Sequence, residues 1–334
     1  MEALREFEVV TNSYDVTEGR QASGSVKAVT KSGTNQFHGS AFAYFWDARL
    51  GADKNLRGQI LKVAAMPSLW VLMICDSTGL ANYDKDGQMK NPGFKVLHVQ
   101  DIYFNSHCKT FEQALGEIKQ WSDQHPNHYP IYITVNAKEE PPKFNGGTTP
   151  EEFIENKFDL LDKEILKFLG ESKLLTPDYI RGSCNTLNEA VSKKNWPRLQ
   201  EAKGKFLFIL DENDQKRSLY KSGHPSLKGR AIFMNAEAGE PEAAILIMNE
   251  PINQKNKINE MVLKGYIVRT RADANTIEAR KNDRCRFEAS KASGEQIITT
   301  DYYLPSSHFK SPYKVSFEEN TYIRAYPFKH LIYD

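Results

Sequence analysis

Apolar residues in the second part of the chain form short runs that alternate with amphipathic stretches. These runs predict seven strands, at 69–75, 94–99, 131–136, 206–211, 243–248, 266–271 and 296–302. Most of them are almost continuously apolar, which is typical of strands covered on both faces. Helical spacing of apolar residues predicts helices between them, at 110–124, 150–170, 187–194, 253–264 and 276–293.

Strands that alternate with helices favour a parallel sheet or barrel. Positions 69–334 are long enough for an eight-stranded α/β barrel, which takes about 250 residues. Seven strands are one fewer than such a barrel needs. We therefore expect an α/β fold, a TIM-like (β/α) barrel whose first βα unit is missing or replaced. A doubly wound open sheet is the competing architecture, but the glycine-rich phosphate loop typical of it does not follow the first strand.

The first 60 residues have a different composition. They are rich in Gly, Ser, Thr and Asn, and strand-like runs at 7–11, 26–30 and 41–46 are separated by turn-forming residues. This pattern predicts a short β-rich extension before the barrel. The expected division is therefore a fragment at 1–60 and a barrel domain at 69–334.

Charge and hydropathy exclude some classes of function. The net charge of +1 argues against nucleic-acid binding through bulk electrostatics. The longest apolar stretch, 63–75, is interrupted by Pro67 and is shorter than the roughly 20 residues of a membrane span. The first twenty residues mix acidic, basic and apolar types, unlike a secretory signal. The compartment stays open.

The cysteines give little indication of a metal site. Cys75, Cys108, Cys184 and Cys285 lie far apart and form no CxxC pair, which argues against zinc. A disulfide between Cys108 and Cys184 is an alternative that depends on the redox state of the compartment.

Polar residues at the ends of the predicted strands are the candidates for chemistry, because function in α/β barrels gathers at the carboxyl ends of strands. These candidates are His98, Asn136, Lys138, Arg269, Arg271 and Asp301. Alternate residues of a strand share a side, so Asn136 and Lys138 share one face, and Arg269 and Arg271 another. Two arginines, a lysine and a histidine predict an anion site.

Cleavage of a phosphodiester would use this set of side chains. A histidine can pass a proton to the leaving oxygen, while Arg and Lys offset the charge on the phosphate. Structural alternatives exist for each residue. His98 can be a structural histidine, the arginines can be paired with carboxylates, and Asp301 can orient a neighbour. Lys138 adjoins two glutamates in a charge run typical of a solvated loop.

Four longer segments carry a resemblance to a known family. They are FKVLHVQDIYFNSHCKTFEQALGEIKQWSDQHPNHYPIYITVNAK, LLTPDYIRG, NWPRLQEAKGKFLFILD and GYIVRTRADANTIEARKNDRCRFEASKASGEQIITTDYYLP. They resemble the calcium-dependent phosphoinositide phospholipase C family over roughly 69–334. The resemblance implies a TIM-like barrel and a phosphoric diester hydrolase of lipid metabolism that acts on phosphatidylinositol. It also implies two catalytic histidines and Ca2+ held by carboxylates.

Residue by residue, the resemblance can be carried over in part. His98 matches the second catalytic histidine, which protonates the leaving group, and Asn136 with Lys138 fall where the family places a metal ligand and a phosphate contact. Arg269, Arg271 and Asp301 lie in the closing motifs and are expected to bind substrate. The family's first catalytic histidine has no match before residue 69, and the run 69–75 carries no carboxylates. The expected Ca2+ shell is therefore incomplete.

The first part of the chain has a separate resemblance. EFEVVTNSYDVTEGRQASGSVKAVTKSGTNQFHGSAFAYFWDARL resembles the end of the plug domain and the first barrel strand of a TonB-dependent outer-membrane receptor. A junction between residues 58 and 68 would then join fragments of two genes. The receptor fragment is expected to supply a strand to the open edge of the seven-stranded remainder.

Three functional hypotheses follow. The first is a phospholipase C-like phosphodiesterase with incomplete catalytic machinery. Proteins of the family that it resembles are often secreted or periplasmic. The second is a non-catalytic barrel that binds phosphate or inositol, and the third is an outer-membrane receptor fragment. The expected partner is a phosphoinositide or another phosphodiester, with transient contact to a membrane surface, and neither nucleic acid nor a transmembrane span is expected.

Overall fold

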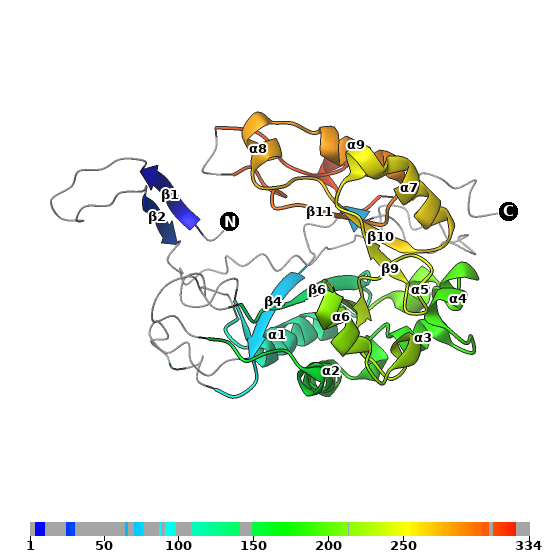
Figure 1. Cartoon of the computed structure of the whole chain (residues 1–334). Helices are drawn as coiled ribbons and strands as arrows, with labels where there is room; N and C mark the ends of the chain where they lie inside the picture. Colours follow the sequence, from blue (N-terminus) through cyan, green and yellow to red (C-terminus); the bar gives the residue numbers. More distant parts are fainter. Residues whose placement is uncertain are drawn as a thin grey trace.

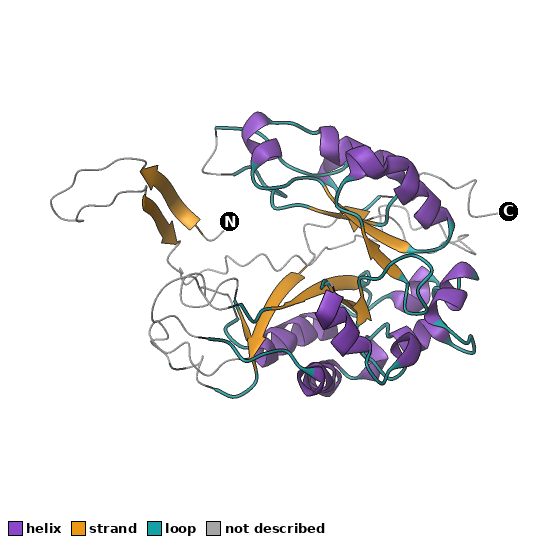
Figure 2. Cartoon of the chain, in the orientation of Figure 1, coloured by secondary structure: helices purple, strands orange, loops and turns teal. Residues whose placement is uncertain are grey.

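The computed structural model describes most of the second part of the chain and short pieces of the first. The described residues are 4–10, 25–30, 64–65, 70–76, 87, 91–97, 108–140, 149–212, 214–306 and 310–324. Two sheets face each other across the centre of the main body, and helices lie on their outer sides (Figures 1 and 2). This arrangement confirms an α/β fold.

The larger sheet has five strands in the order β5-β4-β6-β7-β8. They are β4 (Trp70–Asp76), β5 (Phe94–Val96), β6 (Ile131–Ala137), β7 (Phe206–Leu210) and β8 (Phe233–Met234). All neighbours in it pair in parallel except β5, which is antiparallel to β4. All five residues of β7 are buried, as the continuous apolar run predicts.

The smaller sheet has four parallel strands in the order β3-β11-β10-β9. They are β3 (Ala64–Ala65), β9 (Ile245–Ile247), β10 (Ile267–Arg271) and β11 (Ile297–Thr299). A parallel bridge between Asn235 and Ile245 links β8 to β9. The two sheets therefore continue one another on this side, as the walls of a barrel do. Pairing between β3 and β4 is not among the described contacts, so closure of the barrel stays a prediction.

The segment predicted at 94–99 is the main correction to the strand assignment. Among the described residues of this segment, Phe94–Val96 pair with β4, and they run antiparallel to it. The connection from β4 contains Gly87 and Gly93, with φ of 70° and 91°, a backbone region that favours chain reversal. Strand β8 takes the next place beyond β7, although its two paired residues are too few for a periodic signal.

The edge of β11 that was expected to be open is paired with β3. Ala64 and Ala65 lie opposite Ile297 and Ile298 in parallel register. These two alanines belong to the predicted junction at 58–68, and not to the fragment at 1–60 that was expected to supply a strand. Residues immediately before the predicted barrel domain thus pair with β11, at the edge that was expected to be open.

The helices follow the predicted spacing closely. The confirmed ones are α1 (Phe111–Gln124), α2 (Glu155–Leu169), α4 (Leu187–Ser192) and α7 (Pro251–Leu263). The stretch 276–293 forms two helices, α8 (Ile277–Lys281) and α9 (Cys285–Ser293), because Asn282 between them adopts a left-handed φ of 52°. Helices that the spacing did not predict are α3 (Pro177–Arg181), α5 (Leu199–Ala202) and α6 (Asp214–Lys221).

Short 3-10 turns complete the described secondary structure of the main body, and a hairpin precedes it. The turns are η3 (Glu171–Lys173), η4 (Pro225–Leu227) and η5 (Glu318–Asn320). The strands predicted at 7–11 and 26–30 are present as β1 (Leu4–Val10) and β2 (Ser25–Thr30), which pair antiparallel. The predicted strand at 41–46 lies outside the described residues, and the receptor-like origin of this part stays a prediction.

Two further expectations can be compared with the structure. Cys108, Cys184 and Cys285 are free thiols, so the alternative of a disulfide between Cys108 and Cys184 is wrong. Among the described residues, no helix combines the length and apolar character needed to cross a bilayer.

Candidate functional site

Polar side chains from four parallel strands meet at the carboxyl ends of β6, β7, β9 and β10. Parallel register aligns these ends, because Val135 lies opposite Leu210 and Arg269 lies opposite Ile247. The residues gathered there are called the strand-end cluster and comprise Asn136, Lys138, Asp211, Asn249, Arg269 and Arg271.

Hydrogen bonds and an ion pair connect the cluster across the strands. Asn136 donates from Nδ2 to the main-chain oxygen of Asp211 at 2.5 Å. The Nη1 of Arg269 lies 3.3 Å from Oδ2 of Asp211 and 3.3 Å from Oδ1 of Asn249. Residues from β10, β7 and the end of β9 are thereby held around one guanidinium group.

Asp211 is the carboxylate at the centre of the cluster. Burial raises its pKa, and the positive charges of Arg269, Arg271 and Lys138 oppose that rise without cancelling it. Three cations from two strand ends therefore act on a single carboxylate. These cations make the strand ends a candidate site for an anionic ligand, although the carboxylates of Glu212, Glu250 and Asp301 also act on them.

Arg269 is the most buried cation of the cluster, with 9% of its surface exposed. Burial lowers its pKa, although the neighbouring Asp211 and Asp301 act in the opposite direction. Its Nε is buried and has no hydrogen-bond partner among the described residues. An unpaired donor on a buried charged group is costly, so the guanidinium group of Arg269 has hydrogen-bonding capacity that the described residues do not use.

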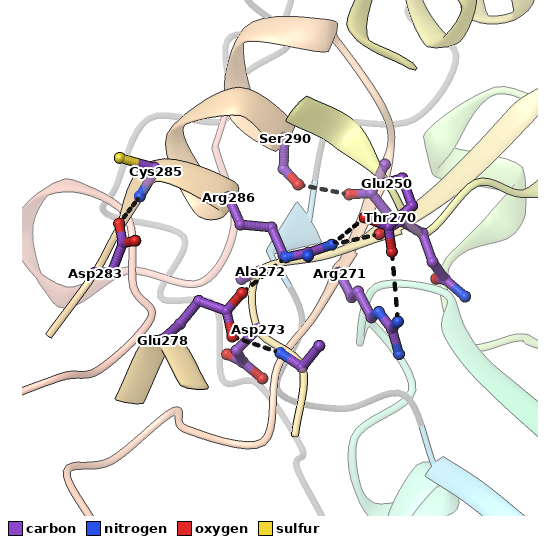
Figure 3. Close-up of polar contacts among 12 residues, drawn as sticks. Glu250, Thr270, Arg271, Ala272, Asp273, Glu278, Asp283, Cys285, Arg286 and Ser290 are labelled. Atoms are coloured by element: carbon purple, nitrogen blue, oxygen red, sulfur yellow. Dashed lines mark hydrogen bonds and ion pairs between the residues drawn. The ribbon is translucent and has the colours of Figure 1, made fainter. Parts of the chain in front are cut away.

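Arg271, two residues after Arg269 on the same face of β10, also has a nitrogen that is unpaired among the described residues. Its Nε is also buried without a partner among the described residues. Its Nη2 lies 3.6 Å from Oε1 of Glu250, which follows β9 (Figure 3). The arginines are thus ion-paired, as the structural alternative proposed, but both retain unused donor capacity.

Asp301 lies beside the cluster and is exposed. Its main-chain nitrogen donates to Oδ1 of Asp273 at 3.0 Å, and Oδ2 of Asp273 accepts from Thr300 and Tyr313. Burial raises the pKa of Asp273 to about 6 despite these hydrogen bonds. Asp273 therefore holds the main chain after β11 in place through these hydrogen bonds. The carboxylate of Asp301 remains at the surface.

Lys138 lies at the end of β6 within an organised set of charges. The adjacent Glu139 accepts from the main-chain nitrogen of Phe153 at 2.8 Å and lies 3.3 Å from Lys216. Lys216 also donates to the main-chain oxygen of Ala137 at 2.7 Å. The charge run that follows β6 is therefore fixed by contacts with other elements, and it is not simply a solvated loop.

His98 lies outside the described residues. Its prediction as catalytic assumed that the strand before it runs parallel to its neighbours, whereas β5 is antiparallel, so the carboxyl end of β5 points away from the strand-end cluster. That part of the argument fails, and the role of His98 stays a prediction that rests on the family resemblance.

The described histidines lie elsewhere. His128 is buried and binds Ser122 and the main-chain oxygen of Tyr129, and its pKa is lowered by burial. His125 and His224 contact main-chain oxygens through Nδ1. In the part of the chain that the structure describes, the strand-end cluster thus contains no histidine.

The described residues do not match the ligand needs of calcium. Ca2+ takes six to eight oxygens, several of them from Asp and Glu. Within the described residues, no group of three or more His, Cys, Asp or Glu side chains is arranged to hold a metal ion. Asp211 is paired with Arg269, and Asn136 has only its Oδ1 left for a metal. Asn136 as a metal ligand therefore stays a prediction.

The sequence interpretation missed Asp211, Asn249 and Glu250. Each follows an apolar run, and the rule that selected Asn136 could have selected them as well. Asp211 was assigned to the predicted strand itself, which hid its position as the first polar residue after it. Asn249 and Glu250 follow β9 in the same manner.

Comparisons with known proteins show the family of the chain and its fold. Residues 65–327 match the model of a family described as phosphoinositide phospholipase C, Ca2+-dependent. No curated protein matches the sequence. A solved apo structure of a calcium-dependent phosphoinositol-specific phospholipase C from Pseudomonas sp aligns with a TM-score of 0.53 and 17% identity, covering 79% of this chain and 93% of that one.

A second structure of the Pseudomonas enzyme, described as an apo form and myoinositol complex, gives a similar result. It aligns with a TM-score of 0.52 and 16% identity, again covering 79% of this chain and 93% of that one. At these identities the likeness shows a shared fold, whereas the family match concerns the sequence itself.

Proposed function

This chain belongs to the calcium-dependent phosphoinositide phospholipase C family, and from this premise we propose that it is a phosphoric diester hydrolase acting on phosphatidylinositol or a related phosphodiester. One observation carries the proposal. Arg269 and Arg271 place two guanidinium groups at the carboxyl ends of the parallel strands, each with an Nε that has no hydrogen-bond partner among the described residues, and Lys138 adds a third positive charge. This arrangement suits the phosphate of a phosphodiester.

The two arginines are proposed to bind the phosphate oxygens. A guanidinium group presents its donors in a fixed planar fork, which matches phosphate better than a single ammonium group does. Because Arg269 is largely buried, its charge is poorly screened by water and acts strongly on a nearby anion. Lys138 is proposed to offset the remaining negative charge, and the exposed carboxylate of Asp301 to accept a hydroxyl group of the head group.

His98 is proposed as the proton donor to the leaving oxygen, on the strength of the family resemblance. A histidine titrates near neutral pH and can supply that proton at physiological pH. The family is described as Ca2+-dependent. Because the donor set in the described residues does not fit calcium, no step is assigned to the metal.

A second candidate function is binding without turnover. It is favoured by the contrast between a well-formed cationic cluster and the absence of a histidine from that cluster within the described residues. In this case the barrel would hold a phosphoinositide head group at a membrane surface and release it unchanged.

Cleavage of phosphatidylinositol vesicles separates the two candidates. Hydrolysis predicts that the purified full chain releases inositol phosphate, and assays with Ca2+ and with a chelator show whether the metal of the family is used. H98A and R271Q should lower the rate by about a hundredfold, the usual cost of losing one such group. R280Q, at an exposed position of α8, serves as the matched control.

Failure of turnover would still be informative. A folded wild-type protein that binds inositol 1-phosphate in an Arg271-dependent manner, but cleaves nothing, would support binding alone. A folded protein that neither cleaves the lipid nor binds inositol 1-phosphate would contradict both candidates.

A further inference from the structure

Glu250 places its carboxylate between two arginines that come from different elements (Figure 3). Oε1 lies 3.6 Å from Nη2 of Arg271, at the end of β10, and Oε2 lies 3.0 Å from Nη1 of Arg286, in α9. Glu250 directly precedes α7 and follows β9, so it lies at the carboxyl ends of the strands, as the strand-end cluster does.

The two ion pairs of Glu250 differ in quality. The contact with Arg286 is a hydrogen bond, whereas 3.6 Å to Arg271 exceeds the range of N–H···O hydrogen bonds. The side chains of Arg271 and Glu250 are 37% and 46% exposed, and ion pairs of this kind contribute little free energy. Arg271 is therefore weakly held, and Glu250 is held mainly from the side of Arg286.

Arg286 is itself fixed by two groups besides Glu250. Its Nε donates to Oε1 of the buried Glu278 at 2.9 Å, and its Nη1 donates to the main-chain oxygen of Asn249 at 2.9 Å. The other oxygen of Glu278 accepts from the main-chain nitrogen of Ala274 at 2.8 Å, in the loop after β10. Glu250 would thus keep a well-anchored cation even if Arg271 moved away from it.

We propose that Glu250 is an internal anion that occupies Arg271 in the ligand-free protein and is replaced there by the phosphate of the ligand, while its contact with Arg286 persists. The inference rests on the proposed function, since it takes Arg271 to be a phosphate-binding residue. An anion that binds weakly gains little by replacing a carboxylate that already contacts Arg271. Glu250 therefore favours phosphate over anions that bind more weakly. Arg286 acts as a positioning residue through Glu250.

The proposal predicts opposite effects from two substitutions in the same network. E250Q removes the competing charge and should tighten binding of inorganic phosphate by about two- to fivefold at low salt, the range of a partly exposed ion pair. R286Q leaves Glu250 with Arg271 as its remaining cation in the network, and should weaken phosphate binding. A merely structural role would make both variants weaker.

Titration calorimetry on the full chain provides the measurement, with inorganic phosphate and with inositol 1-phosphate as separate probes. E260Q is the matched control, because Glu260 lies on α7 and pairs with Lys264 at an exposed position. Equal tightening of both probes by E250Q assigns the effect to the phosphate group. Tightening only of inositol 1-phosphate would place Glu250 beside the inositol hydroxyls and overturn the proposal.

The background of R271Q links the effect to the proposed partner. We expect the gain from E250Q to vanish in the double variant, because Arg271 is the residue that Glu250 occupies. Phosphate binding that weakens in R271Q but fails to tighten in E250Q would overturn this inference and leave the proposed function intact. Phosphate binding unaffected by R271Q would overturn both.

Discussion

Single residues in this molecule combine deep burial with charge, and each case has a local explanation. Arg269 is balanced by Asp211, and Asp273 by three hydrogen-bond donors. Glu295, which precedes β11, is less well satisfied. It is fully buried, and Ser293 donates to its Oε2 at 2.6 Å, whereas its Oε1 has no hydrogen-bond partner among the described residues.

Glu295 gives the protein a predicted pH dependence of stability. Burial raises its pKa from 4.5 to about 8. The folded state therefore binds the proton more tightly than the unfolded chain does, and stability falls as pH rises through the interval from about 4.5 to 8. At 1.36 kcal/mol per pKa unit, the loss amounts to roughly 3–5 kcal/mol.

Denaturant unfolding at pH 5.5 and pH 8.5 measures this effect. E295Q cannot ionise, so its free energy of unfolding should change less between the two pH values than that of the wild type. E318Q, at a surface position, is the control and should follow the wild type. Equal pH dependence in E295Q and the wild type would show that Glu295 titrates normally.

At the scale of elements, the turns between helices and strands set where the site residues lie. Gly265 ends the connection from α7 to β10 with a φ of 96°, and β10 then carries both site arginines. A Cβ atom there would collide with the main-chain oxygen of Val191. Gly116 lies within α1, where a Cβ atom would meet nothing within 4 Å.

Alanine at these two glycines should act in opposite directions. G265A introduces a left-handed alanine and a main-chain collision, so it should lower the free energy of unfolding by more than about 1 kcal/mol. G116A should raise it by up to about 1 kcal/mol, because alanine favours a helix more than glycine does. Chemical denaturation tests both, and stabilisation by G265A would contradict the described turn.

At the scale of the whole molecule, much of the barrel-like arrangement could be predicted from sequence. Continuous apolar runs located β4, β6, β7, β9, β10 and β11, because burial on both faces leaves a clear signal. Two-residue strands such as β8 leave none, and the antiparallel direction of β5 depends on the turn before it. The sequence predicts one helix where the structure has α8 and α9, because the left-handed Asn282 between them does not interrupt the helical spacing of apolar residues.

The candidate site was predicted in part, for a related reason. Local pattern showed which residues end a strand, and that was sufficient for Asn136, Lys138, Arg269 and Arg271. It could not show partners from distant strands. The position of Asp211 among three cations and the sharing of Glu250 between two arginines arise from tertiary packing.

The strand-end cluster is proposed to bind the phosphate of a phosphoinositide-type ligand. A crystal structure of the full chain with inositol 1-phosphate tests it most directly. We expect phosphate oxygens within hydrogen-bond distance of the guanidinium groups of Arg269 and Arg271, close to Lys138. A phosphate bound elsewhere, with both arginines unchanged, would contradict it.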